Sequence, residues 1–328
     1  MGLARVRTLL HAAMGTGEDF VRGGRQGFVI QRDFETMGRN TMLTLDAFAR
    51  KTYDSAHLPP SPFGCDVHTH TLESRHAYST IGECVAAAKA AGLELLGSTD
   101  HYSSMLYPVP RDERQYLRNY QYFINFEMWP RVWDGVYVLH GVEADIVDLD
   151  GHLFGWDICL TEGITGKAFR WQQSMKDHLW RGIDYAIASI HNDEFTFGAT
   201  LAQTTNMYIR ALDDPKVLIV GHPGRAGVPF DVDAVLLAAK ERGKLIEINE
   251  HSFAPHYGAR CRTACRQIAE RCAELGVMIA ISTDAHIACD VGRFDAVQAL
   301  LEEIHFPREL VATRDAATFI DVLNKAVG

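Results

Sequence analysis

Short apolar runs alternate with amphipathic helical stretches from residue 63 onward, and this alternation constrains the fold more than any other feature. Seven of the runs are predicted to be strands: 63–68, 93–99, 136–143, 185–190, 217–221, 244–249 and 277–282. Strands that alternate with helices form mainly parallel sheets, with the helices on the outside. The pattern therefore predicts a β/α barrel, closed or slightly distorted, with one strand fewer than the common eight.

Signals for the start and end of helices support the same alternation. Thr80 and Glu83 form a possible capping box, and Gly92 follows the predicted helix that ends near residue 91. Asp231 stands before the apolar pattern of residues 232–241, and Gly243 follows it. We therefore expect a helix after the first predicted strand and another after the fifth.

Residues 1–62 differ from the rest of the chain. They contain helical patches separated by glycines and end in the proline-rich sequence LPPSP at 58–62. Proline-rich joints are stiff and extended. We predict a helical N-terminal extension over 1–62 and a single hydrolase barrel over 63–328.

Composition excludes several classes of function. The formal net charge of −10 and the pI near 5.8 argue against nucleic acid as a main partner. No apolar run approaches the roughly 20 residues that a membrane-spanning helix needs. Seven scattered cysteines and the lack of a signal-peptide pattern lead us to expect a cytoplasmic protein without structural disulfides.

Metal-binding residue types stand where the predicted strands end. The sequence CDVHTH at 65–70 places two histidines two positions apart, and strand residues at i and i+2 point to the same side. Five of the other strands also end in histidine or a carboxylate, and the residues are Asp100, His101, Glu143, His191, His222, Asp284 and His286. The carboxyl ends of barrel strands converge on one mouth, where active sites are built.

The residue types favour an open, catalytic metal site. Imidazole and carboxylate suit zinc, manganese or iron, whereas closed structural zinc sites are rich in cysteine. A single strand-end histidine is more often an ordinary hydrogen-bonding residue than a ligand. The shared strand-end position of six strands favours ligands here. Six histidines lack this position and remain unassigned: His140, His152, His178, His251, His256 and His305.

Eight segments together resemble the PHP (polymerase and histidinol phosphatase) superfamily and, within it, the YcdX-like phosphatases. They occur in the family order between about residues 63 and 310: DVHTH at 66–70, HAYST at 76–80, STDH at 98–101, GVEA at 141–144, SIH at 189–191, GHPG at 221–224, EIN at 247–249 and STDAH at 282–286. The resemblance implies a distorted (β/α)7 barrel and a centre of three divalent metal ions.

Carried over by position, the resemblance assigns nine ligands. It places one ion on His68, His70, Glu143 and Asp284, a second on Glu143, His191 and His222, and a third on His76, His101 and His286. His76 is assigned by the resemblance alone. We expect zinc first, with manganese or iron as alternatives.

The function expected from these residues is hydrolysis of a small-molecule phosphomonoester by a metal-bridging hydroxide. Glu143 and Asp284 would act through the metals. Arg225, three residues after His222, is a candidate for binding a phosphate oxygen, and Asp100 for orienting a ligand or a water. For Arg225 a surface position is an equally good interpretation, and for Asp100 the alternative is a loop or N-cap hydrogen bond.

Alternatives remain open on the sequence. The same metal ions could serve a phosphodiesterase or a cyclic-phosphate hydrolase. An amidohydrolase is a second alternative, because those barrels also begin with an H-x-H pair. A third is a non-catalytic scaffold, in which the metal centre only stabilises the barrel. The segments 102–120 and 146–181 differ from the corresponding YcdX-like loops, so the substrate is not predicted. A homo-oligomer is possible.

Overall fold

Seven parallel strands form the central sheet of the protein, which is described here by a computed structural model covering residues 59–106 and 117–327. Their order is β1-β2-β5-β8-β9-β10-β11. Their bounds are β1 Cys65–Thr69, β2 Leu95–Ser98, β5 Val136–Asp145, β8 Tyr185–Ser189, β9 Val217–Val220, β10 Leu245–Asn249 and β11 Ile279–Ser282. All seven predicted strands are therefore confirmed. The predicted helical extension over 1–62 lies, except for residues 59–62, outside the described residues.

The first and last strands approach each other at the carboxyl ends and nearly close the sheet into a barrel. The Asp284 N–H donates to the His68 carbonyl at 2.8 Å, and the His70 N–H donates to the Ala285 carbonyl at 2.9 Å. Thr69 and Ala285 form an isolated parallel bridge. The predicted distorted barrel is confirmed, and its closing contacts join the two segments that carry the first and last predicted ligands.

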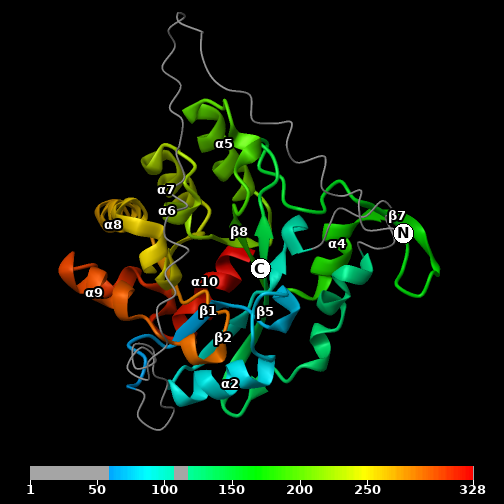
Figure 1. Ribbon diagram of the computed structural model, residues 1–328, viewed down its shortest axis with the longest axis horizontal. Coiled ribbons are helices and arrows are strands. Elements are labelled where there is room, and N and C mark those ends of the chain that lie inside the picture. The colour runs from blue at the N-terminus through cyan, green and yellow to red at the C-terminus, as the bar shows by residue number, and fades with distance from the viewer. Residues whose placement is uncertain (1–58, 107–116, 328) are drawn as a thin grey trace, which may run out of the picture. The chain divides into compact units, whose positions relative to one another are not determined.

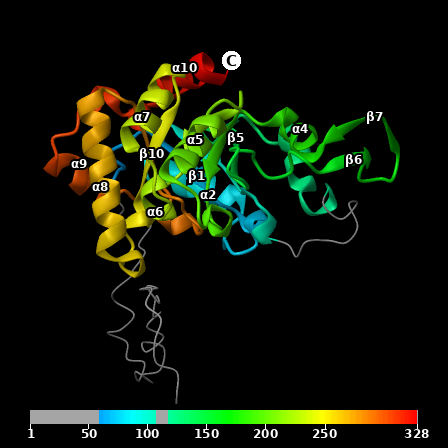
Figure 2. The ribbon, with the colours of Figure 1, turned by 90° about the horizontal axis from the view of Figure 1, so that it is seen from above.

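Helices surround the strands (Figure 1). Their bounds are α2 Ile81–Ala90, α4 Met175–Leu179, α5 Leu201–Ala211, α6 Pro223–Ala226, α7 Val232–Glu241, α8 Gly258–Leu275, α9 Asp295–Glu303 and α10 Ala316–Val327. The segment after β5 forms an antiparallel hairpin, β6 Cys159–Glu162 and β7 Ala168–Ser174, on the side away from α8 and α9 (Figure 2). Two short strands, β3 His101–Tyr102 and β4 Val132–Trp133, pair with β5. No helix in the described ranges is long and apolar enough to cross a membrane.

The predicted helix caps are confirmed. The Glu83 N–H donates to Thr80 Oγ1 at 3.3 Å while the Thr80 N–H donates to Glu83 Oε2 at 2.7 Å, which is a capping box at the start of α2. Asp231 Oδ1 accepts from the Ala234 N–H at 3.1 Å at the start of α7. These caps fix where two helices begin after their strands.

A tyrosine crosses the barrel interior below the mouth. The Tyr185 hydroxyl on β8 donates to the Val67 carbonyl on β1 at 2.6 Å, although two strands, β2 and β5, lie between them in the sheet. Those two strands carry Gly97 and Gly141, and a Cβ at either glycine would overlap the Tyr185 side chain. The ring packs on Phe319 of α10 in an edge-to-face contact at 5.8 Å, so α10 belongs to the same core. The glycines therefore make room for a side chain that ties opposite walls of the barrel.

We expect Gly97→Ala to destabilise the protein by about 1–3 kcal/mol, because the new methyl group would displace the Tyr185 hydroxyl. The unfolding midpoint in denaturant measures this loss. Gly182→Ala is the matched control, since no atom lies within 4 Å of a Cβ built there. In a Tyr185→Phe background the cost of Gly97→Ala should shrink. An equal cost in both backgrounds would contradict the proposed overlap.

Candidate metal centre

Glu143 on β5 stands at the centre of the cluster at the mouth. Its carboxylate is fully buried, and its two oxygens lie within 3.5 Å of ring nitrogens from five histidines. The distances are 3.3 Å to His68 Nε2, 3.5 Å to His70 Nε2, 2.7 Å to His101 Nδ1, 3.3 Å to His191 Nε2 and 2.8 Å to His222 Nε2. Histidines from four segments far apart in sequence therefore meet at one carboxylate.

Asp284 provides a second carboxylate at the edge of the same cluster. Its Oδ1 lies 3.0 Å from His70 Nε2 and 3.6 Å from His68 Nε2, and its Oδ2 accepts from Arg225 Nη2 at 2.6 Å. The residue has a positive φ of 56°, a left-handed conformation that aspartate tolerates better than most side chains. The chain turns here directly after β11, which brings the carboxylate to the mouth.

Two further histidines, His76 and His286, gather with His101 on the outer side of the cluster. His76 Nε2 lies 3.0 Å from His286 Nε2 and 3.3 Å from His101 Nε2. The rings of His76 and His286 are nearly stacked, with centroids 4.7 Å apart. Facing ring nitrogens at these distances need a shared proton or a cation between them. His76 follows a short turn after β1 rather than a strand end, and strand spacing alone could not have found it.

All nine residues predicted as ligands lie together at the mouth. Three groups within them have ligand atoms that all lie within 4.8 Å of one another. The groups are His68, His70 and Glu143; His101, Glu143 and His191; and His70, His101 and His286. These groups share members, so the geometry brings the ligands together without dividing them into the three sets that the resemblance implies.

Several polar atoms in the cluster fit bound metal ions. Within the described residues, the buried atoms His68 Nε2, His70 Nε2, His101 Nδ1 and Glu143 Oε2 lie close to one another or to Asp284 but make no well-aligned hydrogen bond. A buried polar atom without a partner costs about 1–3 kcal/mol. The unpartnered atoms are imidazole nitrogens and a carboxylate oxygen, which are the donors that divalent transition metals bind. The residues present therefore fit metal ions.

An outer layer of carboxylates fixes the orientation of two of these rings. Carboxylates only accept hydrogen bonds, so the histidine nitrogen that faces one carries the proton. His68 Nδ1 donates to Glu247 Oε1 at 2.7 Å, and His191 Nδ1 donates to Asp145 Oδ1 at 2.6 Å. In both rings Nε2 is the nitrogen on the side of Glu143, and it can bind a metal ion once it has lost its proton. The sequence assigned no role to Asp145, and it placed Glu247 only within the EIN segment of the resemblance.

Asp100 acts on a third ring through a serine. His70 Nδ1 donates to Ser74 Oγ at 3.0 Å, and the Ser74 hydroxyl donates to Asp100 Oδ1 at 2.6 Å. Asp100 also accepts from the Thr71 N–H and hydroxyl, both at 2.7 Å. The structure thus places Asp100 behind His70 rather than at the centre of the cluster.

His251 lies closer to the cluster than its sequence position indicated. It follows the end of β10 by two residues, and its ring centroid is 6.2 Å from that of His286. The sequence analysis took candidate ligands only from strand ends, whereas the first turn after β10 also lies near the cluster.

The two central carboxylates are ionised. Burial raises the pKa of Glu143, but His191, His68 and His101 lower it more, and the pKa is held well below its usual range. Burial also raises the pKa of Asp284, but Arg225 and His68 again lower it well below normal. Both groups are therefore negative at neutral pH and able to bind cations.

The imidazoles divide into two kinds. Burial lowers the pKa of His70 well below normal and that of His222 to about 4, so both are neutral near pH 7. For His68 and His191, burial lowers the pKa but nearby carboxylates raise it more, well above normal for His68 and to about 10 for His191. These two rings are protonated in the protein without metal.

We expect metal binding at pH 7 to release about two protons per chain, because ligation requires His68 and His191 to be neutral. Apparent affinity should rise with pH, since both groups lose their protons only above neutrality. Calorimetric titration of zinc in buffers of different ionisation enthalpy measures the release. A heat that does not depend on the buffer would contradict the assignment.

Replacing Glu247 by glutamine should weaken metal binding by roughly 10- to 100-fold, because the ring of His68 loses the carboxylate that orients it. Competition with a chromophoric chelator gives the affinity. Glu250→Gln is the matched control, since Glu250 accepts from the N–H groups of Ala296 and Val297 at the start of α9. It should lower thermal stability and leave the metal affinity unchanged. Equal affinities for both variants would contradict the role of Glu247.

Comparison with known proteins places the chain among phosphatases. No protein-family model matches the sequence. The chain is 36% identical over 263 residues to a probable phosphatase of Acetivibrio thermocellus, which covers 80% of this chain and 96% of that protein. It is 38% identical over 246 residues to a probable phosphatase of Caldanaerobacter subterraneus subsp. tengcongensis, covering 75% and 85%. A solved structure of histidinol phosphate phosphatase from Lactococcus lactis matches at 18% identity and a TM-score of 0.46, covering 74% of this chain and 94% of that one.

Proposed function

The chain belongs to the PHP superfamily of phosphatases, and we propose that it is a phosphomonoesterase acting on small molecules at a centre of three divalent metal ions. As a member it is a metal-dependent phosphoric ester hydrolase. One observation carries the proposal. The buried carboxylate of Glu143 lies within 3.5 Å of five imidazoles, and three of the nitrogens that face it, His68 Nε2, His70 Nε2 and His101 Nδ1, make no well-aligned hydrogen bond among the described residues.

The proposed ligand sets follow the resemblance and are supported by proximity. One ion would be held by His68, His70, Glu143 and Asp284, a second by Glu143, His191 and His222, and a third by His76, His101 and His286. Glu143 would contribute to two sets, because its Oε1 lies near His68, His191 and His222 while its Oε2 lies near His70 and His101. Nitrogen and carboxylate ligands favour zinc, with manganese or iron as alternatives.

When bound, the ions would lower the pKa of a water and offset the negative charge that develops on the phosphoryl group. The protein's own residues prepare the site for this chemistry. Acceptor groups hold the Nδ1 protons of three rings: Glu247 that of His68, Asp145 that of His191, and Ser74 with Asp100 that of His70. The Nε2 atom of each ring is therefore available as a metal ligand. We therefore assign Asp100 as a positioning residue.

Arg225 is proposed to bind a phosphate oxygen. Its Nη2 contacts Asp284, while Nη1 is buried and has no hydrogen-bond partner in the described part of the chain. The guanidinium also lies over the ring of Tyr257, 5.4 Å from the centroid, which limits its movement. A fixed guanidinium with a free donor beside the cluster suits a tetrahedral oxyanion.

The direct test is phosphate release by the zinc-loaded protein from sugar, nucleotide and amino-alcohol phosphates. We expect turnover of monoesters and slower cleavage of bis(4-nitrophenyl) phosphate than of 4-nitrophenyl phosphate. His68→Ala should reduce release to the background of metal-free protein, because it removes a ligand at the centre. His305→Asn, at an exposed histidine with a positive φ of 52°, is the control that should keep activity. Full metal occupancy without turnover of any monoester would overturn the proposal, and faster diester cleavage would favour the phosphodiesterase alternative.

A further inference from the structure

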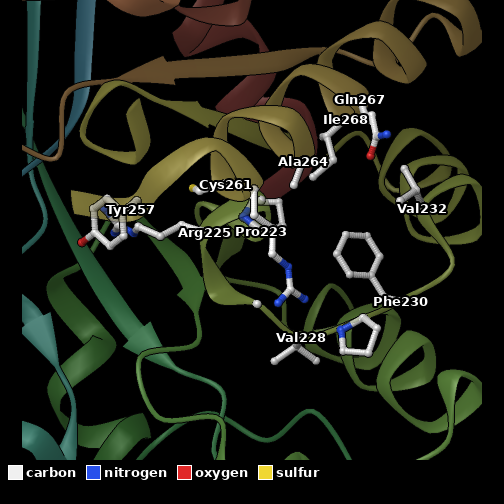
Figure 3. Close-up of a pocket in the computed structure, with 14 residues that line it drawn as sticks. Pro223, Arg225, Val228, Phe230, Val232, Tyr257, Cys261, Ala264, Gln267 and Ile268 are labelled. Atoms are coloured by element: carbon white, nitrogen blue, oxygen red, sulfur yellow. The ribbon is translucent and has the colours of Figure 1, made fainter. Parts of the chain in front are cut away.

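A cavity of about 380 Å³ lies between the segment after β9 and the N-terminal half of α8 (Figure 3). One wall is formed by residues of the segment 223–232 and the other by residues of 257–268. The two segments approach closely because Gly224 has no side chain, since a Cβ there would lie 2.7 Å from Cys265 Sγ. They follow the neighbouring strands β9 and β10 in the chain, on the side of the carboxyl ends that form the mouth of the barrel.

Arg225 connects this cavity to the proposed metal centre. Its side chain lines the cavity beside Tyr257 (Figure 3), and its Nη2 lies 2.6 Å from Oδ2 of Asp284, a proposed metal ligand. A phosphate bound at the centre and contacted by Arg225 would therefore lie next to residues that line the cavity.

The charged side chains that line the cavity are arginines, one of them already paired with Asp284, in a protein whose formal net charge is −10. Two arginines, Arg225 and Arg260, line it, and none of its lining residues is an aspartate or glutamate. Arg260 is exposed and forms no ion pair with any described carboxylate. Arg225 is 10% exposed and keeps Nη1 without a partner in the described ranges. The first turn of α8, an 18-residue helix whose N-cap residue Tyr257 makes no side-chain cap hydrogen bond, contributes to the same wall.

The remaining wall is apolar. Val228, Phe230, Val232 and Ile268 line the end of the cavity away from Tyr257 (Figure 3). Such surfaces suit an apolar or flat body, while a few charged groups fix the orientation of a ligand.

We infer that this cavity holds the leaving group of the substrate, and that this leaving group has an apolar body and a second anionic group that binds Arg260. The inference rests on the proposed phosphomonoesterase function. Arg225 would then contact the reacting phosphate while Arg260 selects for the second anion, which can be a carboxylate or a phosphoryl-type group.

Three aryl phosphates of the same shape test this inference: 4-carboxyphenyl, 4-phosphonophenyl and 4-carbamoylphenyl phosphate. The first two carry a second anion of different kind, and the third is neutral at that position. We expect the zinc-loaded protein to prefer an anionic ester over the carbamoyl ester in kcat/KM. Arg260→Gln should reduce this preference by about tenfold, because a charge-assisted hydrogen bond is lost.

Arg262→Gln is the matched control, since Arg262 is exposed on the same helix and does not line the cavity. It should keep the wild-type preference. Release of phosphate from all three esters without an anionic preference, or with a preference that Arg260→Gln leaves intact, would overturn the inference while the proposed function stands.

Failure of the proposed function would give a different result, namely no phosphate release from any of the three esters with metal bound. The leaving-group assignment would then fail with it. Calorimetric titration with 4-hydroxybenzoate separates the anion site from the activity. Weaker binding by Arg260→Gln than by Arg262→Gln would keep Arg260 as an anion-binding residue, and equal binding would overturn that role too.

Discussion

The burial of Glu143 among five imidazoles is the interaction on which the rest of the structure depends. An isolated buried carboxylate is strongly disfavoured, so this one requires positive charge or metal around it. The barrel supplies the arrangement by bringing the ends of β1, β8 and β9, and the short strand β3, to one point beside β5. Tyr185 and the closing contacts between His68 and Asp284 hold that point in place from below and from the side.

The burial of Glu143 also requires the layer of carboxylates and serine that lies behind the histidines and accepts from their Nδ1 atoms. A ring that is to present Nε2 to a cation must lose its freedom to turn, and a carboxylate or serine on Nδ1 achieves this. Glu247 links two elements in this way, because its Oε1 accepts from His68 and its Oε2 accepts from the His222 N–H at 2.6 Å. One glutamate on β10 thus fixes a ring on β1 and the backbone after β9. Rigidity of this kind is what a preorganised electrostatic site needs.

The sequence predicted the strands and most of the cluster because both follow from local pattern and barrel register. Each strand is an apolar run, and ligands at equivalent strand ends must meet. The roles of Asp145 and Glu247 were not predicted because their partners, His191 and His68, lie 46 and 179 positions away, and no local pattern encodes that contact. The hairpin within 146–181 and the cavity between α6 and α8 depend on packing between elements, and not on the periodicity of apolar residues or the spacing of motifs. The close approach that Gly224 permits is an example of such packing.

A crystal structure with anomalous scattering collected across the zinc, manganese and iron edges tests the central claim most directly. We expect three peaks at the mouth, two of which contact the Glu143 carboxylate while the third contacts His76, His101 and His286. The Nε2 atoms of His68 and His191 should face metal, and their Nδ1 atoms should keep the bonds to Glu247 and Asp145. A fully loaded protein with no ion in contact with Glu143 would contradict the claim.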